Sequence, residues 1–143
     1  MGKSNEKISF NNFRELWDVV KENFECLNTE NIEEAYNEYL NNNTAIRFAR
    51  KGLYVPNIEI KFPTKDLDYL SLKNKIQVVL NKNSIYTSPI EIQIIFKIYL
   101  GSEKDLEDAR HLYNIFKQHL NRKLLDSLFR KLNIPEERKR LIS

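Results

Sequence analysis

The sequence predicts an α+β fold, a small and mostly antiparallel sheet packed with about five to six helices. Apolar residues recur at helical spacing near both ends of the chain, whereas the middle alternates between apolar and polar residues. Eight Phe and seven Tyr supply the bulky groups of a core. Because 143 residues suit one domain, we expect a single domain over residues 1–143. Its parts are a helical segment at 11–51, a strand, short helix and hairpin at 53–88, and a helical part at 88–134.

The N-terminal segment should be helical throughout. Apolar residues spaced three and four apart predict an amphipathic helix over 11–27 and a second helix over about 32–40. A third, short helix is expected at 44–51, with Gly52 as its C-cap. The lone cysteine, Cys26, then falls on a helix face, where we interpret it as a packing residue, with a reactive thiol as the alternative.

The period of the pattern changes after this segment. Ile58, Ile60 and Phe62 alternate with charged residues, which predicts a half-buried strand. A short helix should follow from Thr64. Two further strands, at 76–80 and 84–87, are separated by asparagine-rich residues that favour a tight turn, so we expect a hairpin.

The segment Ser88-Pro89-Ile90-Glu91 is the clearest local signal for a helix start. Ser88 suits the N-cap, Pro89 the first helical position, and Glu91 the returning partner of a capping box. The apolar helix that begins here should end at Gly101.

Two more helices are expected in the C-terminal part. Ser102 can cap the first, and the second should begin near Arg122. Pro135 should end the ordered chain, leaving the charged residues 136–143 frayed.

Composition limits the classes of function. The net charge of +3, from 23 basic and 20 acidic residues, is too balanced to indicate a nucleic-acid partner by itself. A single cysteine excludes a disulfide framework and a cysteine-based zinc site. No apolar run approaches the roughly 18 residues of a membrane span, and the N-terminus lacks a signal-peptide pattern. We therefore expect a cytoplasmic protein without a membrane partner.

The segment SPIEIQIIFKIYLGSEKDLEDA, at 88–109, resembles the C-terminal helical signature of nucleotidyltransferase-like proteins of the DNA polymerase β superfamily. The branch concerned includes minimal nucleotidyltransferases and abortive-infection proteins of the toxin–antitoxin type. The resemblance covers roughly residues 53–120. The residues that carry it are Ser88, Pro89, Glu91, Lys97, Lys104, Asp105 and Asp108.

The catalytic signature of that family does not appear in the sequence. The family carries a Gly-Ser pair followed by paired carboxylates on a strand, which with a third carboxylate hold two Mg²⁺ ions. Here the only Gly-Ser pair, Gly101-Ser102, lies between two helices. Asp66 and Asp68 have the spacing of the pair but follow a predicted helix start, so we interpret them as acids that favour the helix dipole, with metal ligands as the alternative.

The resemblance implies four candidate nucleotide-binding residues and one candidate metal ligand. Lys97 would point a cation at a triphosphate, unless it is a helix-edge lysine whose ammonium reaches solvent. Lys104, Asp105 and Asp108 would orient Lys97 or the substrate, unless they form a solvated helix start. Glu59 lies on the strand of the third carboxylate and would contribute to Mg²⁺ binding if nucleotide binding is retained; a solvent-facing strand residue is the alternative.

Two functions follow as expectations. The first is a degenerate nucleotidyltransferase-like protein that acts as a non-catalytic module and binds a nucleotide or a partner protein. The second is a fragment or subunit of an active Mg²⁺-dependent nucleotidyltransferase, completed by another chain or by missing N-terminal residues. An exposed apolar sheet edge would favour the second, because the missing strands must dock there.

Overall fold

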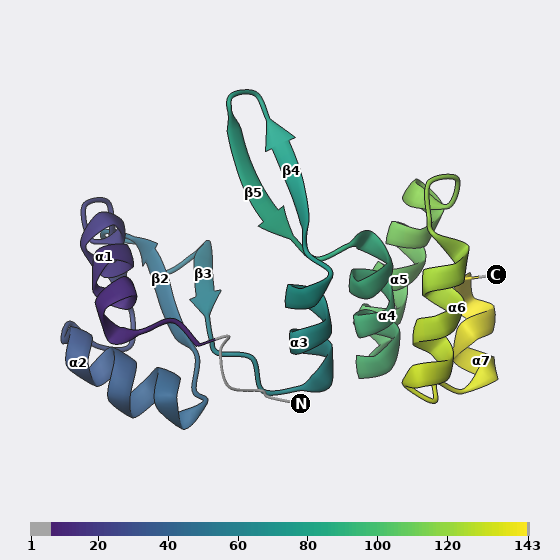
Figure 1. The fold of residues 1–143 in the computed structure, drawn as a ribbon, viewed down its shortest axis with the longest axis horizontal. Helices are drawn as coiled ribbons and strands as arrows, with labels where there is room; N and C mark the ends of the chain where they lie inside the picture. Colours follow the sequence, from purple (N-terminus) through teal and green to yellow (C-terminus); the bar gives the residue numbers. More distant parts are fainter. Residues whose placement is uncertain (1–6, 143) are drawn as a thin grey trace. The chain divides into compact units, whose positions relative to one another are not determined.

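The computed structural model describes residues 7–142 and confirms the α+β fold. Helices and two small antiparallel sheets divide between two compact units, Met1–Thr64 and Lys65–Ser143 (Figure 1). Each unit has its own hydrophobic core, and each is described by itself below. The expectation of one domain over residues 1–143 stays a prediction.

The first unit begins with helix α1 (Phe10–Val20), capped by the Ser9 hydroxyl, which accepts from the Asn12 amide at 3.2 Å. The predicted helix over 11–27 is wrong beyond Val20. Phe24–Cys26 form strand β1, which pairs antiparallel with a later strand. This long-range pairing overrides the local helical spacing. Cys26 is therefore a half-buried strand residue.

The second predicted helix is confirmed in an irregular form. The segment consists of α2 (Ile32–Glu34), a π-helical turn (Ala35–Tyr39) and a 3₁₀ turn (Leu40–Asn42). The Asn31 side chain caps its start by accepting from the Glu34 amide at 2.9 Å. Asn43, with φ of 59°, ends it in the left-handed conformation that Asn tolerates.

The predicted third helix at 44–51 is wrong. Ile46–Arg50 instead form β2, the central strand of an antiparallel sheet with order β1-β2-β3, where β3 is Asn57–Ile60. The side chains of Ile46 and Phe48 are buried on one face, while Arg47 between them is exposed. This face contacts the helices of the unit in an aromatic core. The fully or nearly buried members of that core are Phe13, Trp17, Ala35, Leu40, Ile46, Phe48 and Phe62.

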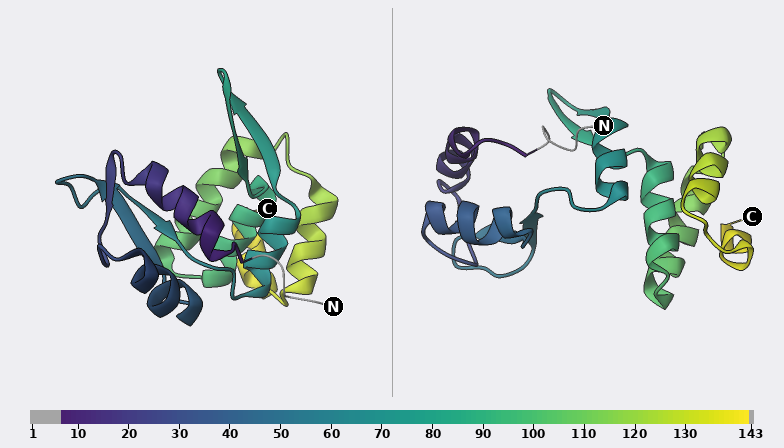
Figure 2. Two further views of the ribbon diagram at one scale, coloured as in Figure 1. Left: turned by 60° about the vertical axis from the view of Figure 1, so that its left-hand side comes forward. Right: turned by 60° about the horizontal axis from the view of Figure 1, so that its bottom comes forward.

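The second unit starts with α3 (Asp66–Lys73), where Asp66 and Asp68 lie in the first turn. The Asp68 carboxylate accepts from the Lys65 amide at 3.1 Å, in agreement with a helix-start role. The predicted hairpin follows as β4 (Ile76–Leu80) and β5 (Asn83–Thr87), which form a separate two-stranded sheet. It projects from the helices of its unit in both Figure 1 and Figure 2.

The C-terminal helices are α4 (Ile90–Leu100), α5 (Glu103–Phe116), α6 (Arg122–Lys131) and α7 (Glu136–Lys139). The predicted turn between α4 and α5 is confirmed. Gly101 has φ of 73°, and the Ser102 hydroxyl accepts from the Asp105 amide at 3.2 Å. The core between these helices is mainly aliphatic. Its buried members are Ile92, Ile94, Ile95, Ile98, Ala109, Tyr113, Leu120, Leu125, Leu128, Phe129 and Ile142. None of the helices within residues 7–142 has the length and apolar content needed to cross a membrane.

Glu91 does not form the predicted capping box. It is the one charged side chain recorded as buried within residues 7–142, and its carboxylate accepts from the Asn121 amide at 2.6 Å. This contact joins the start of α4 to the start of α6, 30 residues later in the chain. A distant backbone donor has replaced the local one, because the carboxylate is turned into the helical core.

Through Ile142 the tail forms regular turns, in contrast to the frayed end predicted after Pro135. Residues Arg140–Ile142 form a 3₁₀ turn after α7, and Ile142 is buried. The Arg138 guanidinium donates to the carbonyl oxygens of Ile98 and Tyr99, at 3.1 and 3.3 Å, at the end of α4. Those carbonyls have no partner within their own helix, so a charged donor from the tail satisfies them.

Candidate functional site

Lys97 and Asp108 meet across the turn between α4 and α5. The Lys97 Nζ lies 2.8 Å from the Asp108 Oδ2, and the two side chains are 29% and 44% exposed. The reversal at Gly101 makes this contact possible, because it lays α5 back along α4. The two residues, with Lys104 and Asp105, form what we call the α4–α5 charged cluster.

The charges of this cluster lower the pKa of the Asp108 carboxyl below its ordinary value of 3.8. The hydrogen bond from Lys97 is the main cause; desolvation opposes it, and the charge interactions with Lys97, Lys104 and His111 lower the pKa by smaller amounts. Asp108 is therefore ionised at neutral pH. Its negative charge holds the Lys97 ammonium at the C-terminal half of a mainly apolar helix.

Asp105 and Lys104 differ from this pair. The Ser102 hydroxyl donates to the Asp105 Oδ2 at 2.5 Å and accepts from the Asp105 amide, so this carboxylate belongs to the start of α5. Lys104 is exposed and acts on Asp108 through its charge. The structure thus brings Lys97, Asp108 and Lys104 into electrostatic contact and gives Asp105 a capping contact.

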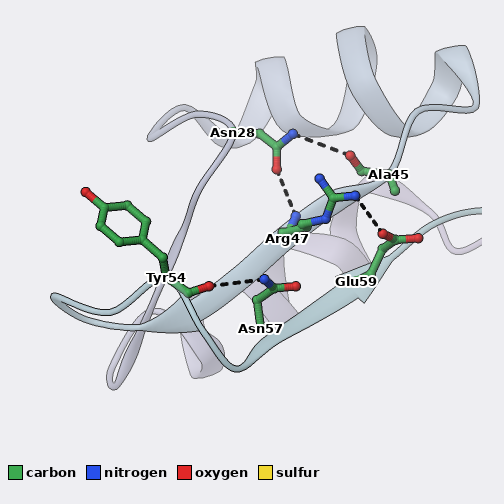
Figure 3. A network of polar contacts seen from close by, with 6 residues as sticks. All are labelled: Asn28, Ala45, Arg47, Tyr54, Asn57 and Glu59. Atoms are coloured by element: carbon green, nitrogen blue, oxygen red, sulfur yellow. Dashed lines mark hydrogen bonds and ion pairs between the residues drawn. The ribbon is translucent and has the colours of Figure 1, made fainter.

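Glu59 lies in the first unit, on the outer face of strand β3. Figure 3 shows its carboxylate against the Arg47 guanidinium of strand β2, with the Arg47 Nη2 3.0 Å from the Glu59 Oε2. The same network continues through Asn28, whose side chain accepts from the Arg47 amide at 2.8 Å and donates to the Ala45 carbonyl at 3.4 Å. Arg47 and Glu59 are cross-strand partners, so the pair stabilises the register of the sheet.

The described residues around Glu59 do not fit a magnesium site. Its charge is met by Arg47, and within residues 7–142 no three or more His, Cys, Asp or Glu side chains gather closely enough to bind a metal ion. Mg²⁺ is held by several oxygen ligands and retains water. Glu59 as a metal ligand therefore stays a prediction that requires donors from outside those residues.

The first unit contains a cavity of about 300 Å³ that the sequence pattern does not predict. Its wall includes Trp17, Phe48 and Cys26, with Lys21 and Lys51 among the charged residues around it. The cavity forms because β1 and β2 are strands, whereas the sequence pattern predicts helices in both places. Apolar residues flank a charged one in both places, with Phe24 and Cys26 around Glu25 and Ile46 and Phe48 around Arg47. This alternation is compatible with strands, but it is too short to exclude the helical spacing before the pairing partners are known.

Comparisons of the chain with protein-family models, with curated proteins and with solved structures found no match.

Proposed function

We propose that this chain is a nucleotidyltransferase-like module that binds a nucleotide or a partner and does not carry out nucleotidyl transfer by itself. The observation that supports nucleotide binding is the position of the Lys97 side chain. Its ammonium emerges from a mainly apolar helix, remains partly exposed, and is held by Asp108 at 2.8 Å. A cation that is already oriented loses less conformational freedom when it binds a phosphate.

The chemistry of the α4–α5 charged cluster suits recognition of a phosphate chain. Lysine acts on phosphate as a point charge, and Lys104 adds a second cation on the adjacent helix. The contribution of the cluster would be electrostatic, with Asp108 holding Lys97 in place. Affinity should therefore fall as the salt concentration rises.

A subunit of an active Mg²⁺-dependent nucleotidyltransferase is the second candidate, and a specific observation favours it. Strand β3 lies at the edge of its sheet, and its Ile58 is 55% exposed. An open, apolar strand edge can accept a further strand from another chain. Because Glu59 lies on the same strand, a docked chain could bring further carboxylates to it.

Isothermal titration of ATP, GTP and CTP, each with and without Mg²⁺, tests the nucleotide proposal. The wild type should bind at least one of them, and Lys97→Ala should weaken that binding by at least about tenfold. Lys117→Ala is the matched control, since Lys117 is an exposed lysine at the C-cap of α5 outside the cluster. Its affinity should equal that of the wild type.

Three outcomes separate the candidates. Binding without Mg²⁺ that Lys97→Ala weakens supports the non-catalytic module. Binding that requires Mg²⁺ favours the second candidate, because the carboxylates that bind the metal ion would then have to come from another chain or from residues outside this one. Absence of binding by all three nucleotides at millimolar concentration would contradict a nucleotide site in the α4–α5 charged cluster.

A further inference from the structure

The basic residues of the chain are concentrated in its C-terminal part. Residues 110–142 contain nine basic and three acidic side chains, against 23 and 20 in the chain as a whole. The preceding residues, 1–109, are therefore acidic in net charge. A basic surface separated in this way attracts polyanions even when the total charge of the protein is small.

Several of these cations hold the second unit together. The Arg138 guanidinium contacts the carbonyl oxygens that end α4. Arg110 donates from its Nε to the Leu141 carbonyl oxygen at 3.4 Å, and Arg122 donates to the Tyr113 hydroxyl at 2.5 Å. These three arginines have partners within the unit, so their presence needs no external anion.

The exposed side of helix α6 carries a different set of cations. The inward side of this helix consists of the buried Leu125, Leu128 and Phe129. With 3.6 residues per turn, the residues opposite them point to solvent. The exposed residues on that opposite side are Lys123, Asp126, Ser127, Arg130 and Lys131. We call the three cations among them, Lys123, Arg130 and Lys131, the basic face of α6.

The charge of the basic face is not neutralised within the described residues. There, the side chains of Lys123 and Lys131 form no ion pair or hydrogen bond. Arg130 donates from its Nε to the Asp126 carbonyl oxygen of its own helix, at 3.4 Å. The Asp126 carboxylate lies 4.0 Å from the Lys139 ammonium, so another lysine already meets the acid on this side. The basic face therefore remains available to an external anion.

The stability of α6 does not explain Lys123. This lysine lies in the first turn of the helix, which contains no acid, and the positive end of the helix dipole repels a cation there. Glu136 and Glu137 lie in the first turn of α7, and they form no ion pair with the basic face within residues 7–142. A cation in an unfavourable position without a partner is better explained by binding.

We infer that the basic face of α6 binds the phosphate backbone of a double-stranded nucleic acid without reading its sequence. Lysine and arginine are the side chains that most often contact phosphate. Lys123 and Arg130 are seven residues apart, about 10 Å along the helix axis, which matches about three phosphate steps on one strand of a duplex. The basic face shares no residue with the α4–α5 charged cluster, so this inference does not rest on nucleotide binding.

The composition of the same surface disfavours two other anionic partners. Proteins bind a single strand by stacking its bases on exposed aromatic rings. Helices bind a membrane surface through apolar side chains that accompany the cations. None of the large hydrophobic side chains of residues 117–142 is exposed. The surface thus offers charge without stacking or insertion, which suits the backbone of a duplex.

Fluorescence anisotropy with labelled duplexes of about 20 base pairs, one of DNA and one of RNA, tests the inference on the full chain. At about 50 mM salt we expect dissociation constants on the order of 1 to 10 micromolar. The logarithm of the affinity should fall with the logarithm of the salt concentration with a slope near about −3, because three cations release counterions. Lys123→Glu should weaken binding at least about fivefold and reduce the slope by about one.

Lys82→Glu is the matched control, since it makes the same charge change at an exposed lysine of the hairpin turn. Because it lies outside the basic face, it should change the dissociation constant less than about twofold. Loss of folding does not confound the comparison. Lys123→Glu places an acid in the first turn of α6, where it favours the helix dipole, so its midpoint of thermal unfolding should equal or exceed that of the wild type.

The outcomes separate the duplex from other partners. Weakening by Lys123→Glu alone, on either duplex, supports the inference, and the duplex bound more tightly identifies the source of the phosphates. Absence of binding by both duplexes at about 100 micromolar protein, or equal losses in the two variants, would overturn it. Tighter binding of a single strand of the same length, of vesicles containing phosphatidylserine, or of poly-glutamate would overturn it too, because each indicates a different class of partner.

Discussion

The two β-structures of this protein have similar strand lengths but opposite surroundings. In the first unit, β2 is the central strand, and its Ile46 and Phe48 are buried against helices. In the second unit, β4 and β5 form a pair whose apolar residues are exposed. Alternation of apolar and polar residues indicates a strand and identifies its apolar side. It does not indicate what covers that side, which depends on residues far away in the chain.

Removing a large side chain from the covered sheet should have the largest effect. Phe48→Ala deletes a buried ring that lies 5.4 Å, centre to centre, from Trp17, and should lower the free energy of unfolding by about 3–5 kcal/mol. Trp17 is the only tryptophan, so its fluorescence reports unfolding of the first unit in urea. The counterpart in the hairpin, Val79→Ala, should change the stability of the second unit, followed by circular dichroism, by less than about 0.5 kcal/mol. Equal losses from the two variants would contradict the difference in burial.

The next effect in size is expected at a polar contact in the helical core of the second unit, between the starts of α4 and α6. Glu91→Ala leaves the Asn121 amide without its acceptor and should cost about 1–3 kcal/mol in thermal unfolding followed by circular dichroism. Glu91→Gln retains a side-chain oxygen and should lose less. If the two variants unfold alike, the contact between α4 and α6 does not depend on this acceptor.

The smallest effect is expected at Asp108. Its pKa is lowered in the folded state, so ionisation stabilises the fold above the pKa of the unfolded chain, and this contribution disappears as the pH falls through the folded pKa. Asp108→Asn should therefore lower the midpoint of thermal unfolding slightly at pH 7, and the difference from the wild type should vanish in strongly acidic solution. Asp18→Asn, at an exposed site in α1, is the control. A difference that persists in acid would place its cause outside the ion pair with Lys97.

Much of the fold could be predicted, because many of its determinants are local. The turn at Gly101-Ser102 and the hairpin turn at Asn81 depend on the conformations and caps that these residue types favour. Strand β2 could not be predicted in the same way. The residues around Ile46 and Phe48 fit a short helix by spacing, and only pairing with β1 and β3 makes them a strand.

The candidate site was only partly accessible to sequence reasoning. Lys97 and Asp108 could be selected as residues, but 11 positions separate them, and their contact depends on how the two helices pack. Glu91 shows the opposite case. Its local motif predicts a capping box with Ser88 as N-cap, yet the N-cap of α4 is Pro89 and the partner of Glu91 is a backbone amide 30 residues away.

Gly101 has a consequence for how substitutions combine. A Cβ atom at this position would overlap the guanidinium of Arg138, while the backbone itself has a φ of 73° that side chains resist. The same guanidinium holds the two carbonyls that end α4. A shorter residue at 138 would relieve the overlap but leave the backbone strain at 101 and release those carbonyls. Substitutions at 101 and 138 should therefore be non-additive in stability, as an epistatic pair that is distant in the gene and adjacent in the fold.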